Sequence, residues 1–152
     1  IESAEQMFDT IWSRFGEADV VIKTAAVADY TPTIKHDQKV KKANGDLSIE
    51  FKRTKDILLT LGQNKTHQIL VGFAAETNQV DEYAKSKLLK KNADMIIAND
   101  VTKAGAGFGS DTNIVTIFKR NGEVKPLPIM SKKEVAKEIL LEVHRLLNEV
   151  ER

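Results

Sequence analysis

Hydrophobic positions repeat with a helical period at both ends of the chain. Near the start, Ser3 and Gln6 have the spacing of a capping box, and Gly16 follows the pattern as a stop signal. Near the end, Ser131 and Glu134 have the same spacing. We therefore predict an amphipathic helix at each position, with these residues on the buried faces: Met7, Phe8, Ile11, Trp12 and Phe15 in the first, and Val135, Ile139, Leu140, Val143, Leu146 and Leu147 in the last.

Continuous apolar runs without alternation lie between these helices and predict strands that are buried on both faces. The three runs are residues 20–28, 68–74 and 95–98. Residues 56–61 predict a short helix that Gly62 ends, and Asn78 is positioned to cap a helix that reaches about Asn92. Buried strands that alternate with helices are typical of a parallel sheet with right-handed crossovers.

Two shorter patterns indicate other structure. Residues 47–51 alternate between apolar and polar side chains, which predicts a half-buried strand, whereas residues 31–45 are polar and basic and predict a loop or flap. Residues 113–118 and 124–127 flank Asn121-Gly122, a dipeptide typical of tight hairpins. We therefore expect one α/β domain over residues 1–152, a Rossmann-like, mostly parallel sheet flanked by helices with an antiparallel hairpin extension.

Composition excludes several functional classes. With 23 Lys+Arg against 22 Asp+Glu, the 152-residue chain has a net charge of +1, which argues against a uniformly basic nucleic-acid binder. The absence of cysteine rules out a disulfide scaffold, a thiolate nucleophile and a cysteine-ligated metal. No apolar run approaches the ~20 residues of a membrane span, and no signal peptide is visible, so we expect a cytoplasmic protein without membrane contact.

The carboxyl ends of the predicted parallel strands are the places where ligands bind in folds of this kind. Residues 25–30, 73–77 and 99–100 fall at such ends. Asp29 directly follows the small residues 25–28, which would let a ligand approach the backbone closely. Its carboxylate suits a divalent cation or a ligand amine, and it equally suits the cap of a turn.

Two groups of lysines suggest a phosphorylated ligand. Lys39, Lys41 and Lys42 lie in the predicted flap, where they either close over a polyphosphate or simply keep a surface loop soluble. Lys87 and Lys91 share one helical face, where like charges repel, so a bound anion between them would remove the repulsion. The glycines at 105, 107 and 109 lead into a strand rather than a helix and therefore indicate a structural turn.

Several motifs carry a resemblance to a known family. They follow one another in the family's order along residues 20–118, and they are residues 25–32 (AAVADYTP), 39–42 (the Lys-x-Lys-Lys signature), 55–58 (KDIL), 71–77 (VGFAAET), 92–94 (NAD), 98–101 (ANDV) and 107–113 (GFGSDTN). Together they resemble the phosphopantothenoylcysteine synthetase family. In bacteria this domain is usually the C-terminal half of a bifunctional coenzyme A biosynthesis flavoprotein. The decarboxylase half, which holds FMN, is not visible in this sequence.

The resemblance implies a ligase reaction in two steps. CTP activates the carboxylate of 4'-phosphopantothenate as an acyl-cytidylate and releases pyrophosphate, and the amine of cysteine then displaces CMP. Lys39 would be the catalytic residue that acts on the activated intermediate, and Asp29 would face the nucleotide and its Mg²⁺. The residues implied to bind CTP are Lys23, Thr24, Ala25, Asp29, Lys39, Lys55, Asp56, Ile57, Leu58, Phe73, Lys87 and Lys91.

The resemblance also implies a homodimer, for which the edge of the 113–127 hairpin is a candidate surface. The family's N-terminal strand and its Ser-Asn-x-Ser-Ser-Gly-type nucleotide loop are not found in this sequence, so we expect the domain to lack them. A non-catalytic nucleotide-binding or dimerisation fragment is therefore the alternative. A nicotinamide-dependent oxidoreductase is disfavoured because the sequence has no glycine-rich strand-to-helix turn.

Overall fold

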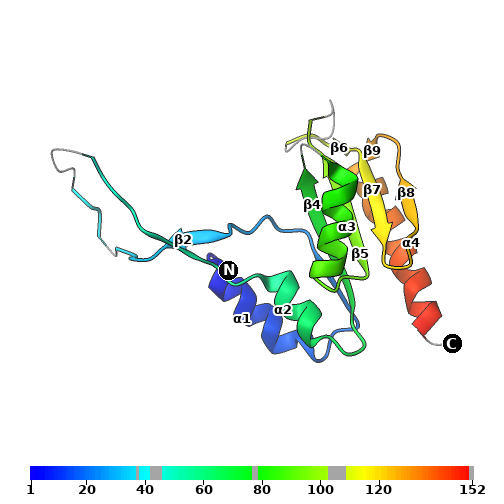
Figure 1. Ribbon diagram of the computed structural model, residues 1–152, viewed down its shortest axis with the longest axis horizontal. Coiled ribbons are helices and arrows are strands. Elements are labelled where there is room, and N and C mark those ends of the chain that lie inside the picture. The colour runs from blue at the N-terminus through cyan, green and yellow to red at the C-terminus, as the bar shows by residue number, and fades with distance from the viewer. Residues whose placement is uncertain (37, 42–45, 77–78, 103–108, 151–152) are drawn as a thin grey trace.

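The central β-sheet of the computed structural model has the strand order β1-β4-β5-β7-β8 (Figure 1). β1, β4 and β5 pair in parallel, β7 runs antiparallel to β5, and β8 runs antiparallel to β7. Four of these five strands therefore point the same way, which confirms the mostly parallel sheet with its hairpin extension. The structure describes residues 1–36, 38–41, 46–76, 79–102 and 109–150. The strands are β1 (Val20–Lys23), β4 (Ile69–Glu76), β5 (Met95–Asp100), β7 (Val115–Lys119) and β8 (Val124–Pro126).

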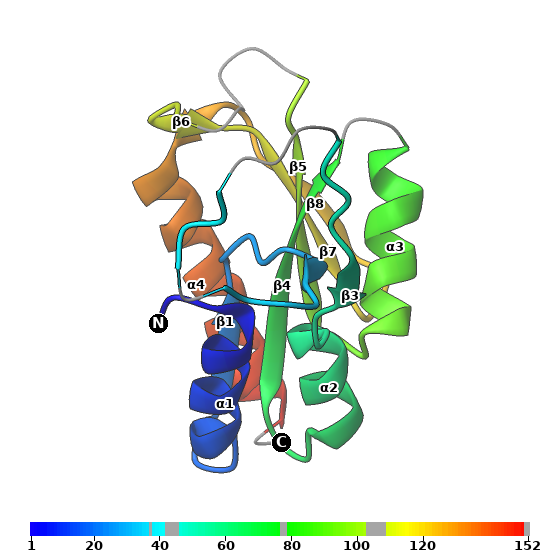
Figure 2. The ribbon, with the colours of Figure 1, turned by 90° about the vertical axis from the view of Figure 1, so that its left-hand side faces the viewer.

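Helices cover both faces of this sheet (Figures 1 and 2). One face carries α1 (Ala4–Phe15), α2 (Ile57–Asn64) and α3 (Val80–Lys90), and the other carries α4 (Lys132–Val150). Each face has its own cluster of buried apolar side chains, which explains why the strands read as continuous apolar runs. The helices contribute Phe8, Phe15, Leu61 and Leu88 to the first cluster, and Val135, Ile139 and Val143 to the second.

Both predicted capping boxes are present. The Ser3 hydroxyl accepts a hydrogen bond from the Gln6 N–H at 3.2 Å, and the Gln6 side chain accepts one from the Ser3 N–H at 3.1 Å. At α4, Ser131 Oγ accepts from the Glu134 N–H at 3.2 Å, and Glu134 Oε2 accepts from the Ser131 N–H at 2.9 Å. These bonds satisfy backbone donors that a helix start leaves without intrahelical partners, and they confirm both predicted helix starts.

A two-stranded ribbon projects away from the sheet and its helices (Figure 1). In it, β2 (Tyr30–Pro32) pairs antiparallel with β3 (Phe51–Arg53), and we call the described residues of 30–53 the arm. The prediction of a half-buried strand over residues 47–51 is wrong, because Leu47 is 75% exposed and the strand begins only at Phe51. The alternation marks one face of a ribbon that stands away from the core.

Two elements differ in length from the sequence prediction. β1 ends at Lys23, where its register with β4 reaches Gly72, so the rest of the apolar run 20–28 lies outside the sheet. Gly62 does not end α2, which continues to Asn64. A side chain at Gly62 would collide with the backbone carbonyl of Lys91, so this glycine allows α2 to approach the end of α3 closely.

The connections also differ in detail from the predicted pattern. α3 begins at Val80, with Gln79 as its N-cap in the left-handed region at φ 46°, and the predicted cap Asn78 lies outside the described residues. Lys42 and the glycines at 105 and 107 also lie outside them. β6 (Thr112–Asn113) pairs with β9 (Met130–Ser131), so the hairpin strand predicted from 113 begins at Val115 instead.

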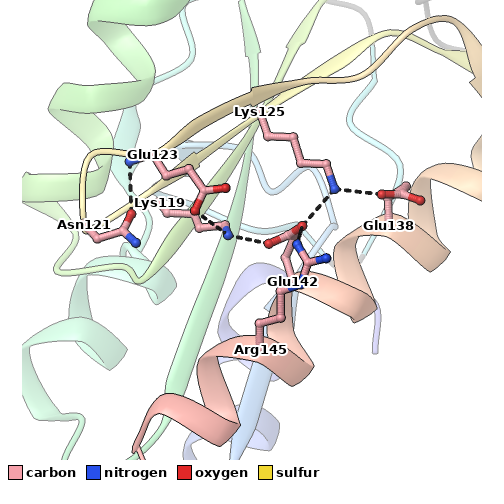
Figure 3. Close-up of polar contacts among 7 residues, drawn as sticks. All are labelled: Lys119, Asn121, Glu123, Lys125, Glu138, Glu142 and Arg145. Carbon is pink, nitrogen blue, oxygen red and sulfur yellow. Dashed lines mark hydrogen bonds and ion pairs between the residues drawn. The ribbon is translucent and has the colours of Figure 1, made fainter.

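The buried face of α4 contains a charge that the sequence pattern did not predict. Leu140, expected on that face, is 57% exposed, whereas Glu142 is fully buried. Glu142 forms ion pairs with Lys119 of β7, Lys125 of β8 and Arg145 (Figure 3). Burial alone would raise the pKa of the Glu142 carboxyl, but hydrogen bonds from Lys119 and Lys125 lower it to about 2. These ion pairs hold α4 against the β7–β8 hairpin.

Candidate active site

The carboxyl ends of β1, β4 and β5 border a cavity of about 270 Å³, which we call the strand-end cavity. Small side chains make up much of its wall, so a ligand there would meet the backbone directly. This is the position that the parallel topology predicted for a ligand. The lining residues are Thr24, Ala25, Ala26, Phe73, Ala74, Ala75, Asn99, Asn113 and Lys132.

A second, smaller hollow of about 60 Å³ adjoins the N-terminus of α2, and we call it the lysine hollow. Lys23 and Val27 line it, and residues 24–26 between them line the strand-end cavity, so the two spaces share one stretch of chain. The lysine hollow carries charges of both signs, whereas Lys132 is the charged residue of the strand-end cavity. Its lining residues are Lys23, Val27, Asp29, Thr54, Lys55, Asp56 and Ile57.

Asp56 is the N-cap of α2 and connects the lysine hollow to α3. Its Oδ1 accepts a hydrogen bond from the Leu59 N–H at 3.0 Å, and its Oδ2 forms an ion pair with Lys91. Partial burial would raise the pKa of the Asp56 carboxyl, but the hydrogen bonds from Lys91 and Leu59 outweigh it, and the pKa is lowered. Asp56 therefore stays ionised and holds the Lys91 amine beside the hollow.

In Lys23, burial outweighs the nearby opposite charges in setting the pKa of the amine. Partial burial is the main cause that lowers the pKa of its amine, Lys91 adds to the shift, and the carboxylates of Asp56 and Asp29 oppose it. Burial disfavours the charged form of a lysine, so an additional anion in the hollow would stabilise the charged amine. The lysine hollow is thus suited to a negatively charged group.

The structure changes the interpretation of the Lys87 and Lys91 pair. The sequence placed both amines on one helical face and so predicted a bound anion between them. In the structure, the Asp56 carboxylate is already the anionic partner of Lys91. Lys87 lies half-buried one turn earlier on α3. An incoming phosphate must therefore compete with, or join, the Asp56 carboxylate at Lys91, and the assignment of both lysines to CTP stays a prediction.

The predicted site residues fall into two groups. The strand ends bring most of them together around the two spaces, although the Lys55 amine lies over the Phe8 ring, 4.3 Å from its centroid. Leu58 is buried in the core, and Lys39 is exposed on the arm, where none of the described hydrogen bonds or ion pairs involves it. The residues that line the two spaces are Lys23, Thr24, Ala25, Asp29, Lys55, Asp56, Ile57 and Phe73.

A cation at Asp29 would find few ligands in the protein itself. Within the described part of the chain, no group of three or more histidine, aspartate or glutamate side chains is placed to hold a metal ion. Asp29 is exposed, and Asp56 is engaged by Lys91. Mg²⁺ commonly takes one or two carboxylates and completes its octahedron with phosphate and water oxygens, so Asp29 fits a Mg²⁺ that arrives with a nucleotide.

Three polar residues of the cavity were not among the residues that the sequence assigned to CTP: Asn99, Asn113 and Lys132. Asn99 lies at a predicted strand end, and Asn113 belongs to one of the family motifs, so both carried a signal. Lys132 is the first residue of α4 after the Ser131 capping box, and its position beside the cavity depends on the pairing of β6 with β9. That pairing joins residues far apart in sequence, and no local pattern indicated it.

The fold and the two spaces define an α/β domain with a ligand site beyond its strand ends and a cluster of lysines beside it, an arrangement typical of proteins that bind phosphorylated ligands. Among the described helices, none combines the length and the apolar character that crossing a membrane requires. The chain belongs to the family described as DNA/pantothenate metabolism flavoprotein C-terminal domain, which matches residues 1–147. The family membership expected from the motifs is therefore confirmed.

Relatives with known names agree with this assignment. The chain is 54% identical over 146 residues to the coenzyme A biosynthesis bifunctional protein CoaBC of Bacillus subtilis, covering 96% of this chain and 36% of the relative. It is 42% identical over 142 residues to the protein of that name in Haemophilus influenzae, covering 93% and 35%. The crystal structure of the C-terminal domain of a CoaBC protein has a TM-score of 0.80 and 46% identity, covering 98% of this chain and 65% of that one. The chain thus spans about a third of the length of the two bifunctional relatives.

Proposed function

We propose that this domain is the CTP-dependent phosphopantothenate–cysteine ligase of coenzyme A biosynthesis. The observation that carries the proposal is that a lysine-lined hollow adjoins a strand-end cavity in a chain of this family. Two adjoining spaces suit a reaction between a nucleoside triphosphate and a smaller carboxylic acid. The cofactor requirement is Mg²⁺, and FMN belongs to the decarboxylase half of bifunctional relatives rather than to this domain.

The proposed reaction begins at the α-phosphorus of CTP. A carboxylate oxygen of 4'-phosphopantothenate forms a bond to that phosphorus, and the bond to the pyrophosphate oxygen breaks, so pyrophosphate leaves. The amine of cysteine then attacks the acyl carbon, loses a proton and expels CMP. Lys23 and Lys91 would neutralise charge on the phosphates, Asp29 would hold the cation, and Lys39 would act on the activated intermediate.

The first prediction concerns stabilisation of the fold by the nucleotide. CTP with Mg²⁺ at ten times its Kd is expected to stabilise the native state by about 1.4 kcal/mol, which raises Tm by about 3 °C in a domain of this size. Lys91→Ala should reduce this shift because Lys91, paired with Asp56, carries positive charge beside the hollow. Lys87→Ala should reduce it as well if Lys87 binds CTP as the family resemblance implies. Lys90→Ala is the matched control, since Lys90 lies on the same helix but is exposed, whereas Lys87 and Lys91 are half-buried and Lys91 pairs with Asp56 of the hollow. Differential scanning fluorimetry measures the shift, and its absence at millimolar CTP–Mg in folded wild-type protein would contradict the site.

The alternative proposal is a nucleotide-binding or dimerisation fragment without catalysis. Both proposals predict the thermal shift with CTP, so binding does not separate them. Release of pyrophosphate does, because it requires the carboxylate to attack the nucleotide. A side-by-side titration with NAD tests the oxidoreductase interpretation, which predicts that NAD stabilises the chain and CTP does not.

The second prediction is that the protein forms a homodimer through the arm. Ile34, Leu47 and Ile49 are 66%, 75% and 54% exposed, and they line a hollow of about 280 Å³ on the ribbon. A two-stranded ribbon is marginally stable in water by itself, and exposed apolar side chains favour a covering partner. We therefore place the proposed interface on the arm rather than on the edge of the β7–β8 hairpin.

Light scattering at tens of micromolar is expected to give the mass of a dimer. Leu47→Ser should shift the mass towards that of the monomer, because it places a hydroxyl in the proposed interface. Leu89→Ser is the control, since Leu89 is 70% exposed on α3, away from the arm. A monomer mass for the wild-type protein would refute the dimer.

A further inference from the structure

α3 ends against α2 on the side of the sheet where β4 and β5 begin (Figure 2). Lys91 is the C-cap of α3, and its backbone lies so close to α2 that a Cβ at Gly62 would collide with the Lys91 carbonyl oxygen. The Lys91 side chain then forms an ion pair with Asp56, the N-cap of α2. Lys91 therefore contacts α2 twice, with its backbone near the C-terminus of that helix and with its amine at the N-terminus.

Asn92 holds the backbone contact in place through its side-chain amide. Its Nδ2 donates a hydrogen bond to the Gly62 carbonyl at 2.7 Å, and its Oδ1 accepts one at 2.6 Å from Arg120 Nη1, in the turn after β7. Because a carbonyl only accepts and a guanidinium only donates, the two bonds fix the orientation of the amide. Asn92 also has a left-handed backbone, with φ 49°, which asparagine adopts more readily than most residues. The same residue thus ends α3 and connects it to α2.

The two contacts of Lys91 lie far apart along α2. The helix between Asp56 and Gly62 is about 9 Å long, at a rise of about 1.5 Å per residue. A lysine amine sits on a flexible four-carbon stem, so its position is defined only when its backbone and its partner are both fixed. Asp56 is fixed by the hydrogen bond from the Leu59 N–H at 3.0 Å, and the Lys91 backbone is fixed by the contacts with Gly62 and Asn92. The amine beside the lysine hollow therefore depends on residues at the other end of α2.

We propose that Asn92, together with Gly62, is a positioning residue of the nucleotide site, which holds the Lys91 backbone so that the Lys91 amine stays beside the lysine hollow. Asn92 contacts α2 at the end away from the hollow, so it acts through Lys91 rather than on a ligand. The inference rests on the proposed function for the identity of the ligand, CTP. The placement of the amine itself is measurable in the protein alone.

The Asp56 carboxyl reports the position of the Lys91 amine without any ligand. Burial would raise the pKa of Asp56, and the hydrogen bond from Lys91 is the largest of the causes that lower it, ahead of the Leu59 N–H and the charge of Lys23. Asn92→Gly keeps the left-handed backbone accessible and removes both side-chain hydrogen bonds. It is expected to raise the Asp56 pKa from its wild-type value toward its value in Lys91→Ala. Titration of the carboxyl by ¹³C NMR measures the change, and Asp56→Asn assigns the signal.

A second variant and a control accompany this measurement. Gly62→Ala disturbs the same contact from the α2 side, because its methyl group has to push the end of α3 away, and it should also raise the Asp56 pKa. Lys65→Gln is the control for a general loss of stability, since the Lys65 side chain is 13% exposed and its amine pairs with Asp94 at 2.6 Å in the same corner of the domain. This control should lower the free energy of unfolding and leave the Asp56 pKa near its wild-type value.

Calorimetric titration of the intact protein with CTP and Mg²⁺ tests the consequence for the nucleotide. Lys91→Ala is expected to weaken binding about tenfold, as the loss of a charged hydrogen bond does. Asn92→Gly should weaken it about threefold to tenfold, and the double variant should bind no more weakly than Lys91→Ala, because the effects of residues that act through one another do not add. Lys65→Gln should leave CTP binding unchanged. A purely structural role of Asn92 would instead make the two losses add.

Three results would overturn the inference: an unchanged Asp56 pKa in Asn92→Gly and Gly62→Ala, an equal rise in Lys65→Gln, and additive losses of CTP binding in the double variant. The proposed function fails in a different way. If the Asp56 pKa responds to Asn92 as expected but CTP supports no ligation, the proposed function is wrong and the placement of the Lys91 amine by Asn92 stands. If ligation occurs and the Asp56 pKa does not respond to Asn92, the proposed function stands and the inference is wrong.

Discussion

Replacement of Glu142 by glutamine is expected to lower the free energy of unfolding by about 3 kcal/mol at pH 7, because a buried carboxylate that pairs with lysines is lost. Glu142 is fully buried, and Lys119, its partner on β7, is 6% exposed. Glutamine has the shape of glutamate but no charge, so among the described residues the Lys119 amine keeps only the half-exposed Glu123 as an ionic partner. Chemical denaturation followed by circular dichroism measures the change.

The effect of Glu142 should disappear in acid. Its pKa falls from 4.5 in the unfolded chain to about 2 in the folded protein, so its contribution to stability is fully present above pH 4.5. As the pH falls from 4.5 to 2, the unfolded chain takes up a proton before the folded protein does, and the contribution of about 3 kcal/mol is lost. The stabilities of the wild-type protein and Glu142→Gln should therefore converge over this range.

Glu138→Gln is the matched control for this variant. Glu138 lies on the same helix and pairs with Lys125 at 2.9 Å, but its side chain is 32% exposed. A half-exposed ion pair contributes at most about 1 kcal/mol, so this variant should lose little stability. A similar loss in Glu138→Gln and Glu142→Gln, or a difference that persists unchanged at pH 2, would contradict the account of α4 docking.

Replacement of Lys39 by glutamine is expected to reduce turnover by at least about 100-fold while it changes CTP binding little. Lys39 is exposed on the arm, and in the described structure no hydrogen bond or ion pair connects it to the strand ends. A group that meets the ligand mainly in the transition state lowers kcat without an equal loss of ground-state affinity. Single-turnover kinetics and CTP titrations of the intact protein measure the two quantities.

Two other variants serve as comparisons for Lys39→Gln. Lys35→Gln removes the same charge from another exposed position on the arm and should leave turnover near the wild-type value. Lys87→Ala should weaken CTP binding itself. Weakening of CTP binding by Lys39→Gln as large as that by Lys87→Ala, with normal turnover of bound CTP, would show that Lys39 is a binding residue rather than a catalytic one.

The sequence predicted those parts of the fold that local patterns determine. Both capping boxes are local, because a hydroxyl and an amide or carboxylate three residues apart satisfy each other's backbone donors. Continuous apolar runs identified β4 and β5, since both of their faces are covered by helices. The alternation of residues 47–51 led to a wrong prediction of burial. Alternation shows that apolar side chains share one face of an extended segment, but it does not show that this face is buried, and in the arm it lies away from the sheet. Gly62 misled because its role is a close approach to Lys91, a residue distant in sequence.

In the candidate site too, the sequence predicted what local patterns and topology determine, but not the contacts between residues distant in sequence. The topological rule for parallel sheets correctly indicated the strand ends, and Thr24, Ala25 and Phe73 line the cavity there. The ion pair between Asp56 and Lys91 was not predicted, since it joins the N-cap of α2 to the end of α3. Glu142 was missed because a helical pattern of apolar residues assumes that the buried face is apolar, whereas lysines on two strands supply the charges that allow a carboxylate there.

The measurement that tests the central claim most directly is an analysis of the reaction products. The intact protein is incubated with 4'-phosphopantothenate, cysteine, CTP and Mg²⁺, and the mixture is resolved by liquid chromatography with mass spectrometry. The account predicts phosphopantothenoylcysteine, CMP and pyrophosphate in equal amounts, and an acyl-cytidylate when cysteine is left out. Protein that CTP stabilises against heat but that forms no phosphopantothenoylcysteine, or that forms CDP and inorganic phosphate instead, would contradict it.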